Sequence, residues 1–229
     1  MPTHAPEPLE RVRDFALPGD VAEAWGMRLR HSGEMRLNLN RPWRSFRAQE
    51  QIDARRLEFR WDARLRLAPL ARAEVREAFQ RGHGRVEARL LGVNVQRSAG
   101  AEIDVTELTR LLSELVWCPM ALYHADLDFD APDSHTLRVG VNRDGVLAGV
   151  TMRLDEAGRI VQVRAAGRPR LIGKATLATD WLGNFGDYRD FGGVRMPARG
   201  EQSWALPDGA FHYLRTEILE AELLGTPEA

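Results

Sequence analysis

Apolar and polar residues alternate along several long stretches of this sequence. From Met27 to Leu39 the odd positions are mostly apolar, and the even positions are mostly charged or polar. A period of two places side chains of one kind on one face of a β-strand. The same pattern recurs in four further stretches, at residues 57–67, 86–90, 137–141 and 146–154. The sequence therefore predicts long strands, each with one buried and one exposed face.

Turn-forming residues separate these strands. Asn, Asp and Gly gather in "NRDG", "DEAG" and "LPDG", at residues 142–145, 155–158 and 206–209. Such residues suit tight reversals, so neighbouring strands should pair antiparallel, and the apolar face of their sheet must curl or be covered. We predict a mainly β (α+β) protein with one domain over residues 1–229. Its single antiparallel sheet, of about ten strands, starts near residue 27, ends near Leu219 and curls into an open half-barrel.

The residues from about 104 to 116 have the period of an amphipathic helix instead. Apolar side chains recur there at spacings of three and four, at Leu108, Leu111, Leu112, Leu115 and Val116. Asp104 is expected to cap the first turn, with Glu107 three residues later, and Pro119 to end the helical pattern. We expect this helix to cover the concave face of the sheet. A shorter helix is expected over residues 7–16.

The stretch "DYRDFGGVRMP" at residues 187–197 has two interpretations. As a hairpin, its residues Asp190 to Gly193 form the turn, and Pro197 lies on an edge or at a bulge. As a site, Asp187 and Tyr188 orient a polar ligand or donate a proton at the rim of the sheet. The sequence leaves both interpretations open.

The composition excludes several classes of partner and chemistry. The 32 basic and 33 acidic residues are interleaved, so we expect no cationic face for nucleic acid. The single Cys118 rules out an internal disulfide, and no Cys/His cluster has metal-site spacing, so we expect no metal or other cofactor. The start of the chain lacks the pattern of a signal peptide, and no apolar run reaches about 18 residues. These features indicate a cytoplasmic protein without an integral membrane segment.

Aromatic residues on the predicted apolar face are candidates for either core or ligand contact. Phe59 and Trp61 lie on that face of one strand, and Trp117 follows the helix that carries Leu112. Large rings bury much apolar surface, which favours core. If the sheet is wider than one helix can cover, however, the remaining face forms a cavity. These four residues are therefore candidate ligand contacts, and His31 on the same face is expected to be a hydrogen-bonded core residue.

Six short motifs follow one another along nearly the whole chain. They are "LERVRDFALPG" at 9–19, "GEMRL" at 33–37, "WRSFRAQEQ" at 43–51, "FRWDAR" at 59–64, "LVWCPMAL" at 115–122 and "DYRDFGGVRMP" at 187–197. In the order and spacing of these motifs, the chain resembles an uncharacterised bacterial family, a domain of unknown function. The resemblance implies no activity. It directs attention to Trp43, Phe46, Gln49, Trp61, Trp117, Pro119, Asp187, Tyr188, Gly193 and Pro197.

Long antiparallel strands with a helix inserted midway and a final hairpin also resemble bacterial lipoprotein carriers of the LolA/LppX type. That resemblance implies an apolar concavity under a helical lid that holds acyl chains. It is a likeness of fold, which does not determine function. Carriers of that type are exported, whereas this sequence shows no export signal.

These observations lead to three functional hypotheses. We predict a non-enzymatic protein that binds an apolar or amphiphilic ligand, such as an acyl chain or a lipid, between the sheet and the helix. The first alternative is a small-molecule enzyme with Asp187, Tyr188 and His31 as acid–base groups, which requires His31 within hydrogen-bond distance of one of the other two. The second alternative is a structural or protein-interaction module.

Overall fold

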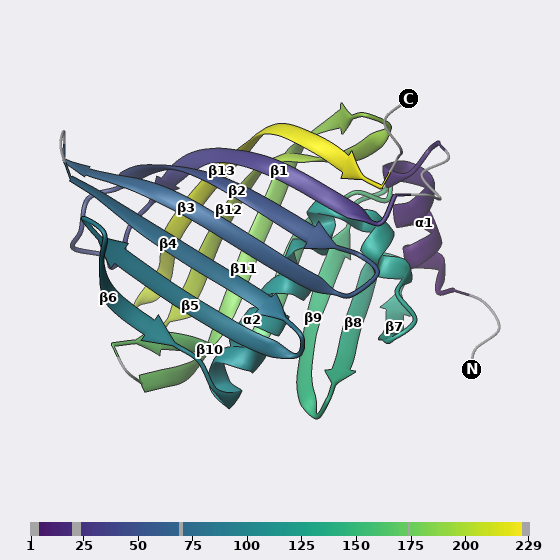
Figure 1. The fold of residues 1–229 in the computed structure, drawn as a ribbon. Helices are drawn as coiled ribbons and strands as arrows, with labels where there is room; N and C mark the ends of the chain where they lie inside the picture. The colour runs from purple at the N-terminus through teal and green to yellow at the C-terminus, as the bar shows by residue number, and fades with distance from the viewer. Residues whose placement is uncertain (1–4, 20–23, 69–70, 174, 226–229) are drawn as a thin grey trace.

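The alternating stretches form the strands of one sheet in the computed structural model, which describes residues 5–19, 24–68, 71–173 and 175–225 (Figure 1). The strands are β1 (Gly26–Met35), β2 (Arg44–Asp53), β3 (Glu58–Ala68), β4 (Ala71–Gln80), β5 (His83–Leu90), β6 (Val93–Ser98), β7 (Leu127–Asp133), β8 (Thr136–Arg143), β9 (Val146–Leu154), β10 (Ile160–Ile172), β11 (Ala175–Phe191), β12 (Val194–Leu206) and β13 (Gly209–Leu224). The helices are α1 (Glu7–Ala16) and α2 (Ala101–Glu114), with short 3-10 helices at Leu115–Trp117 and Pro119–Tyr123.

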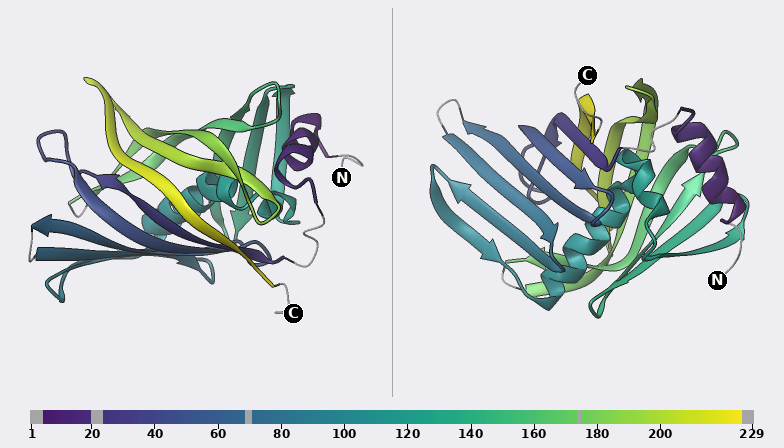
Figure 2. Two further views of the ribbon diagram at one scale, coloured as in Figure 1. Left: turned by 90° about the horizontal axis from the view of Figure 1, so that it is seen from above. Right: turned by 45° about the vertical axis from the view of Figure 1, so that its right-hand side comes forward.

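The sheet is an antiparallel meander whose two halves meet in the middle. Its order is β6-β5-β4-β3-β2-β1-β13-β12-β11-β10-β9-β8-β7, so the last strand pairs with the first. The sheet curls, so that one wall, which contains β4 and β5, faces a second wall, which contains β9 and β10. Helix α2 lies in the trough between these two walls (Figure 2). This arrangement confirms the predicted mainly β fold and its open half-barrel.

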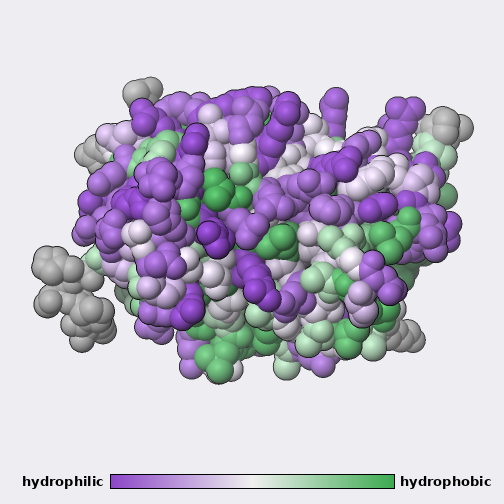
Figure 3. Space-filling view, turned by 180° about the vertical axis from the view of Figure 1, so that it is seen from behind, coloured by the Kyte–Doolittle hydropathy of each residue, from purple (hydrophilic) through white to green (hydrophobic). Residues whose placement is uncertain are grey.

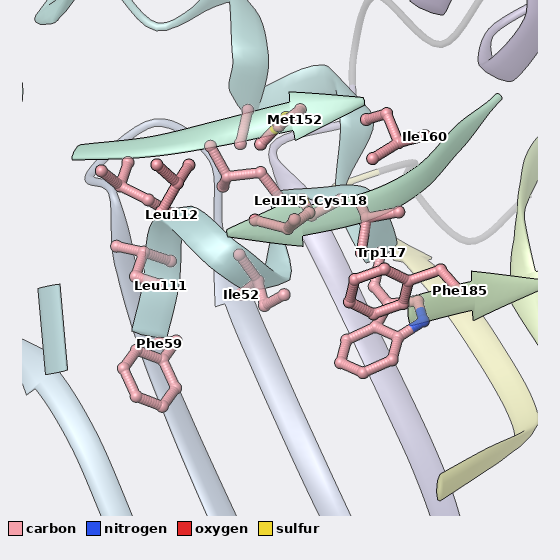
Figure 4. Close-up of a cluster of buried hydrophobic side chains, with 14 of the residues drawn as sticks. Ile52, Phe59, Leu111, Leu112, Leu115, Trp117, Cys118, Met152, Ile160 and Phe185 are labelled. Carbon is pink, nitrogen blue, oxygen red and sulfur yellow. The ribbon is translucent and has the colours of Figure 1, made fainter. Parts of the chain in front are cut away.

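Helix α2 lies against the concave face of the sheet. It contacts β4 and β5 on one wall and β9 and β10 on the other. Its leucine stripe is fully buried, with no exposure at Leu108, Leu111, Leu112 or Leu115. Figure 4 shows Leu111 and Leu112 among Ile52, Phe59 and Met152, which come from both walls. The predicted cover of the concave face is therefore confirmed, and this side of α2 is packed core.

The start of α2 differs from the prediction. The helix begins at Ala101, and the amides of Ile103 and Asp104 both donate to the carbonyl of Gly100 at 2.9 Å. Asp104 therefore lies inside the helix, and its Oδ1 accepts the backbone N–H of Gly84 at 2.6 Å. The predicted capping role of Asp104 is wrong because a donor from β5, distant in sequence, competes for the carboxylate.

The described chain also has more strands than the predicted ten or so. Thirteen strands form the sheet, and the last one continues to Leu224 rather than ending near Leu219. One reason is that an edge strand need not alternate: β6 has several exposed residues in succession. Another is that Glu50, at an inward position of β2, interrupts the apolar alternation by which a strand is recognised.

The segment 187–197 contains a hairpin, as one of its two interpretations predicts. Phe191 pairs with Val194, so Gly192 and Gly193 form a two-residue turn. Both glycines have positive φ, 67° and 92°, which a two-residue hairpin of this kind requires. Asp190 Oδ1 accepts the Gly193 N–H at 2.9 Å and stabilises the turn.

Outward-facing positions along the strands are mostly polar, as the alternation predicts. The surface opposite the view of Figure 1 is largely hydrophilic, with separate apolar patches (Figure 3).

Helix α1 has the predicted bounds and packs Leu9 and Val12 inward near one end of the sheet. In the part of the chain that the structure describes, no helix is long and apolar enough to cross a membrane.

Candidate ligand site

Five of the candidate residues from the sequence lie on the concave side of the sheet. Phe46, Phe59, Trp61, Leu112 and Trp117 are all 3% exposed or less. Phe46 and Trp61 meet edge to face with their ring centroids 5.9 Å apart. Such contacts are typical of packed aromatic core. The concave side is therefore filled where α2 presents its leucines.

Two other candidates lie away from this core. Trp43, in the loop between β1 and β2, is half-buried between the guanidinium groups of Arg36 and Arg215, at 4.8 and 4.6 Å from its ring centre. Gln49 is exposed on the outer face of β2, beside an open depression of about 440 Å³. Both side chains therefore lie apart from the concave-face candidates.

Asp187 and Tyr188 point in different directions. Asp187 is exposed, has a φ of 55°, and forms an ion pair with Arg189 at 2.5 Å. The Tyr188 hydroxyl donates to the carbonyl of Ile160 at 2.7 Å, and its ring packs edge to face on Phe15 of α1. Burial raises the pKa of Tyr188 above its ordinary value. The tyrosine thus links β11 to the start of β10 and to α1.

The three groups of the enzyme alternative are not brought together. His31 lies on β1, whereas Asp187 and Tyr188 lie on β11, and β13 and β12 separate those strands. At about 4.8 Å between strands, this separation is roughly 14 Å. The polar contacts of His31 are instead Glu50, with Nε2 2.9 Å from Oε2, and Thr216, with Nδ1 3.2 Å from Oγ1.

Replacing Tyr188 with phenylalanine is expected to lower the free energy of unfolding by about 1–2 kcal/mol, because the Ile160 carbonyl loses its donor. If Asp187 and Tyr188 form a structural latch, Tyr188→Phe and Asp187→Asn should leave ligand binding unchanged. Thermal melts and binding titrations on both variants test this expectation. Weaker binding without loss of stability would instead assign the pair to a ligand site.

A cavity of about 190 Å³ lies beside α2, on the flank away from the leucines. We call it the polar cavity. Strands from both walls and the middle of the sheet line it together with the helix. Its lining residues are Met35, Trp61, Glu77, Val86, Glu107, Arg110, Ser113, Glu114, Arg168, Arg170, Leu171, Trp181, Gln202, Trp204, Tyr213 and Leu214. The cavity therefore combines aromatic rings with buried charges.

A hydrogen-bonded aromatic group forms one side of the polar cavity. The Trp181 Nε1 donates to the Tyr213 hydroxyl at 2.9 Å, and that hydroxyl donates to Gln202 Oε1 at 2.9 Å. Trp204 stacks on Tyr213 with their ring centroids 5.9 Å apart. The polar ends of Trp181 and Tyr213 both have partners, so the orientation of these two rings is fixed.

Two of the three arginines that line the polar cavity, Arg110 and Arg168, differ in their charge partners. Arg110 of α2 is paired with Glu77 and, through Nε at 2.9 Å, with Glu114. Arg168 of β10 is only 7% exposed, and within the described residues no carboxylate lies within 4.0 Å of its guanidinium. Its Nε is buried without a hydrogen-bond partner in that same part of the chain. Burial lowers the pKa of Arg168.

Buried acids extend from the polar cavity into the core. Burial raises the pKa of both Glu107 and Glu114 to about 8. Burial also raises the pKa of Glu50, whose carboxyl group faces that of Glu114. A shared proton can link these two groups, since two ionised carboxylates would leave their oxygens without donors. The pKa of His31 is lowered by burial to about 4, so its ring is neutral beside this pair at neutral pH.

The sequence analysis missed the polar cavity, although one signal for it is present. Glu107, Arg110 and Glu114 have the spacing i, i+3 and i+7, which places them on one face of α2. Such a stripe is ordinarily assigned to solvent. In a helix enclosed by a curled sheet, the polar flank faces protein instead. The positions of Arg168 and Trp181 depend on the packing of distant strands and have no local signal.

No group of three or more His, Cys, Asp or Glu side chains that could hold a metal ion occurs in residues 5–19, 24–68, 71–173 and 175–225. The ionisable groups of the polar cavity are arranged as isolated charges and pairs around aromatic rings. This arrangement can orient an organic ligand with a polar end.

The fold is similar to that of solved bacterial proteins. A LolA superfamily protein from Nitrosomonas europaea matches with a TM-score of 0.52 and 11% sequence identity over 96% of this chain and 93% of that chain. A DUF1329 family protein from Desulfovibrio piger matches with a TM-score of 0.44 and 12% identity over 96% and 92% of the two chains. The first likeness confirms the fold-level resemblance to LolA proteins, and at this identity it is one of fold alone.

Sequence comparison points to one family. No curated protein matches the chain. A family model described as a family of unknown function, DUF6544, matches residues 1–216, which confirms the resemblance inferred from the motifs. The chain therefore belongs to the DUF6544 family of unknown function.

Proposed function

We propose that this protein is a non-enzymatic binder of a small amphiphilic molecule, which it holds in the polar cavity between α2 and the sheet. The observation that carries the proposal is the group of three tryptophans, Trp61, Trp181 and Trp204, around a cavity that also contains charged side chains. Ligand sites combine apolar walls with a few fixed polar groups that orient the ligand. The likeness to a LolA superfamily protein supports a concave binding face at the level of fold.

The size and walls of the cavity limit the ligand. Its 190 Å³ is below the roughly 300–1,000 Å³ typical of sites for drug-sized ligands, so the ligand is short or displaces side chains when it enters. The apolar part of the ligand lies against the tryptophans and Leu214 rather than against Leu112, whose side chain is already in the filled core.

Native mass spectrometry of protein purified from its own host is expected to detect a bound small molecule. Binding can also be followed through tryptophan fluorescence during titration with a short amphiphile such as 1-octanol. Trp204→Leu should weaken this binding at least about tenfold, because one aromatic wall of the cavity is lost.

Trp43→Leu is the matched control, since Trp43 lies between two arginines outside the cavity. It should leave the affinity within about twofold of the wild-type value. The proposal fails if no molecule co-purifies and no amphiphile binds, or if both tryptophan variants weaken binding equally.

A further inference from the structure

We propose that the polar end of the ligand is an oxyanion, a carboxylate or a phosphate, held by Arg168 with Arg170 beside it. This inference rests on the proposed function, and it names the chemical class of the ligand. It follows from the surroundings of Arg168, from the position of Arg170 and from the charge balance of the polar cavity.

Arg168 is a buried cation whose hydrogen bonds are incomplete. Its guanidinium lies 5.4 Å from the ring centres of both Trp181 and Trp204. Cation–π contact offsets part of the cost of burial, but it leaves the N–H donors in the guanidinium plane unmatched. In the described residues Nε has no acceptor, and no carboxylate comes within 4.0 Å. Burying a charge without a partner is costly, and a ligand oxyanion would supply that partner.

Arg170 adds a second cation on the same side of β10. Residues two apart on a strand face the same way, and both arginines line the polar cavity. The guanidinium of Arg170 is 5.9 Å from the Trp204 ring centre, and its Nε is likewise buried without a partner in the described chain. Two planar guanidinium groups on one strand can donate several hydrogen bonds to the oxygens of a carboxylate or phosphate.

The charges around the cavity leave this positive charge uncompensated at neutral pH. Arg110 is already paired with Glu77. Glu107 and Glu114 are mainly protonated at pH 7, since burial raises the pKa of each to about 8. The protonated carboxyl group of Glu107 can donate a hydrogen bond to an oxyanion as well, whereas that of Glu114 faces Glu50. The cavity therefore has a net positive charge on the side of Arg168.

Calorimetric titration with three eight-carbon probes tests the inference: 1-octanol, octanoate and octyl phosphate. At pH 7 the wild-type protein should bind at least one anionic probe about tenfold or more tightly than octanol, because the anion forms charge-assisted hydrogen bonds. Arg168→Gln should abolish this preference while octanol binding persists. The control Arg164→Gln, on the exposed face of the same strand, should retain it.

The possible outcomes separate the two proposals. Equal affinity of the wild-type protein for octanol and for both anions would overturn the oxyanion inference and leave the proposed function standing. Binding of none of the three probes would overturn the proposed function as well. A preference for octyl phosphate over octanoate, or the reverse, identifies the head group.

A measurement on the wild-type protein keeps the test valid if Arg168→Gln does not fold. The anion preference should fall between pH 7 and pH 9, because ionised Glu107 and Glu114 then place negative charge beside the ligand. The other ionisable groups around them are Glu50, Glu77, Arg110, Arg168, Arg170, Tyr213 and His31. Of these, Arg110 and Arg168 keep their charge over this range. An anion preference that rises over this range would contradict the assignment.

Discussion

Replacing Leu112 with alanine is expected to lower the free energy of unfolding by about 2–5 kcal/mol. The side chain has no exposure and lies with Leu111 among residues from both walls of the half-barrel. Removing it opens a cavity in a region that is packed from all sides, so the loss includes both transfer and cavity terms. Urea denaturation at constant pH measures the change.

Leu147→Ala is the matched control, because Leu147 is 67% exposed on β9. It should change the free energy of unfolding by no more than about 0.5 kcal/mol. A nearly neutral Leu112→Ala, together with tighter binding of a fluorescent fatty-acid probe, would show that the leucine stripe covers a ligand space. That result would move the proposed site from the polar cavity to the other flank of α2.

The sequence contains most of the information needed to predict the fold. Alternation reports directly on which face of a strand is buried, so the walls around Met27, Phe59 and Val139 could be inferred from their neighbours. The leucine spacing in α2 reports in the same way on a helix with one apolar stripe. Both signals come from residues close together in the sequence, and the faces that they mark as apolar are the ones that pack in the core.

The sequence does not predict features that depend on contacts between distant residues. Aspartate is a residue type that often caps helices, yet Asp104 accepts a hydrogen bond from the backbone N–H of Gly84. That donor comes within reach only once β5 and α2 are packed together. Glu50 occupies an inward position because Glu114 and His31 surround it in the folded state. Neither fact can be derived from propensity or periodicity.

The same distinction applies to the residues of the candidate site. Trp61 was identifiable because a large ring on the apolar face of a strand contributes either to core or to a cavity. Arg168 was not, because an arginine in a strand is ordinarily exposed, and its inward position follows a register shift between Ala165 and Arg168 against β11. A bulge of this kind re-aims a side chain without a distinctive local sequence.

Raising the pH from 6.5 to 8 is expected to lower the free energy of unfolding by about 2–4 kcal/mol. Burial raises the pKa of both Glu107 and Glu114 in the folded protein to about 8, from an ordinary value of 4.5. Over this range the folded state therefore binds more protons than the unfolded state, so stability falls as pH rises. The pKa of Glu50 is shifted in the same direction. Urea denaturation at closely spaced pH values measures the slope.

His31 does not reverse this trend. Its ring is neutral in the folded state, where its pKa is about 4, whereas at the ordinary pKa of 6.5 about half of the unfolded chains carry a protonated ring at pH 6.5. His31 therefore opposes the trend by only about 0.4 kcal/mol. Glu107→Gln should remove about half of the slope, because the amide has no proton to lose. Glu34→Gln, at an exposed position of β1, should leave the slope unchanged. Stability that stays level or rises from pH 6.5 to 8 would mean that the two buried carboxyl groups are already ionised, and the charge balance assigned to the polar cavity would then be wrong.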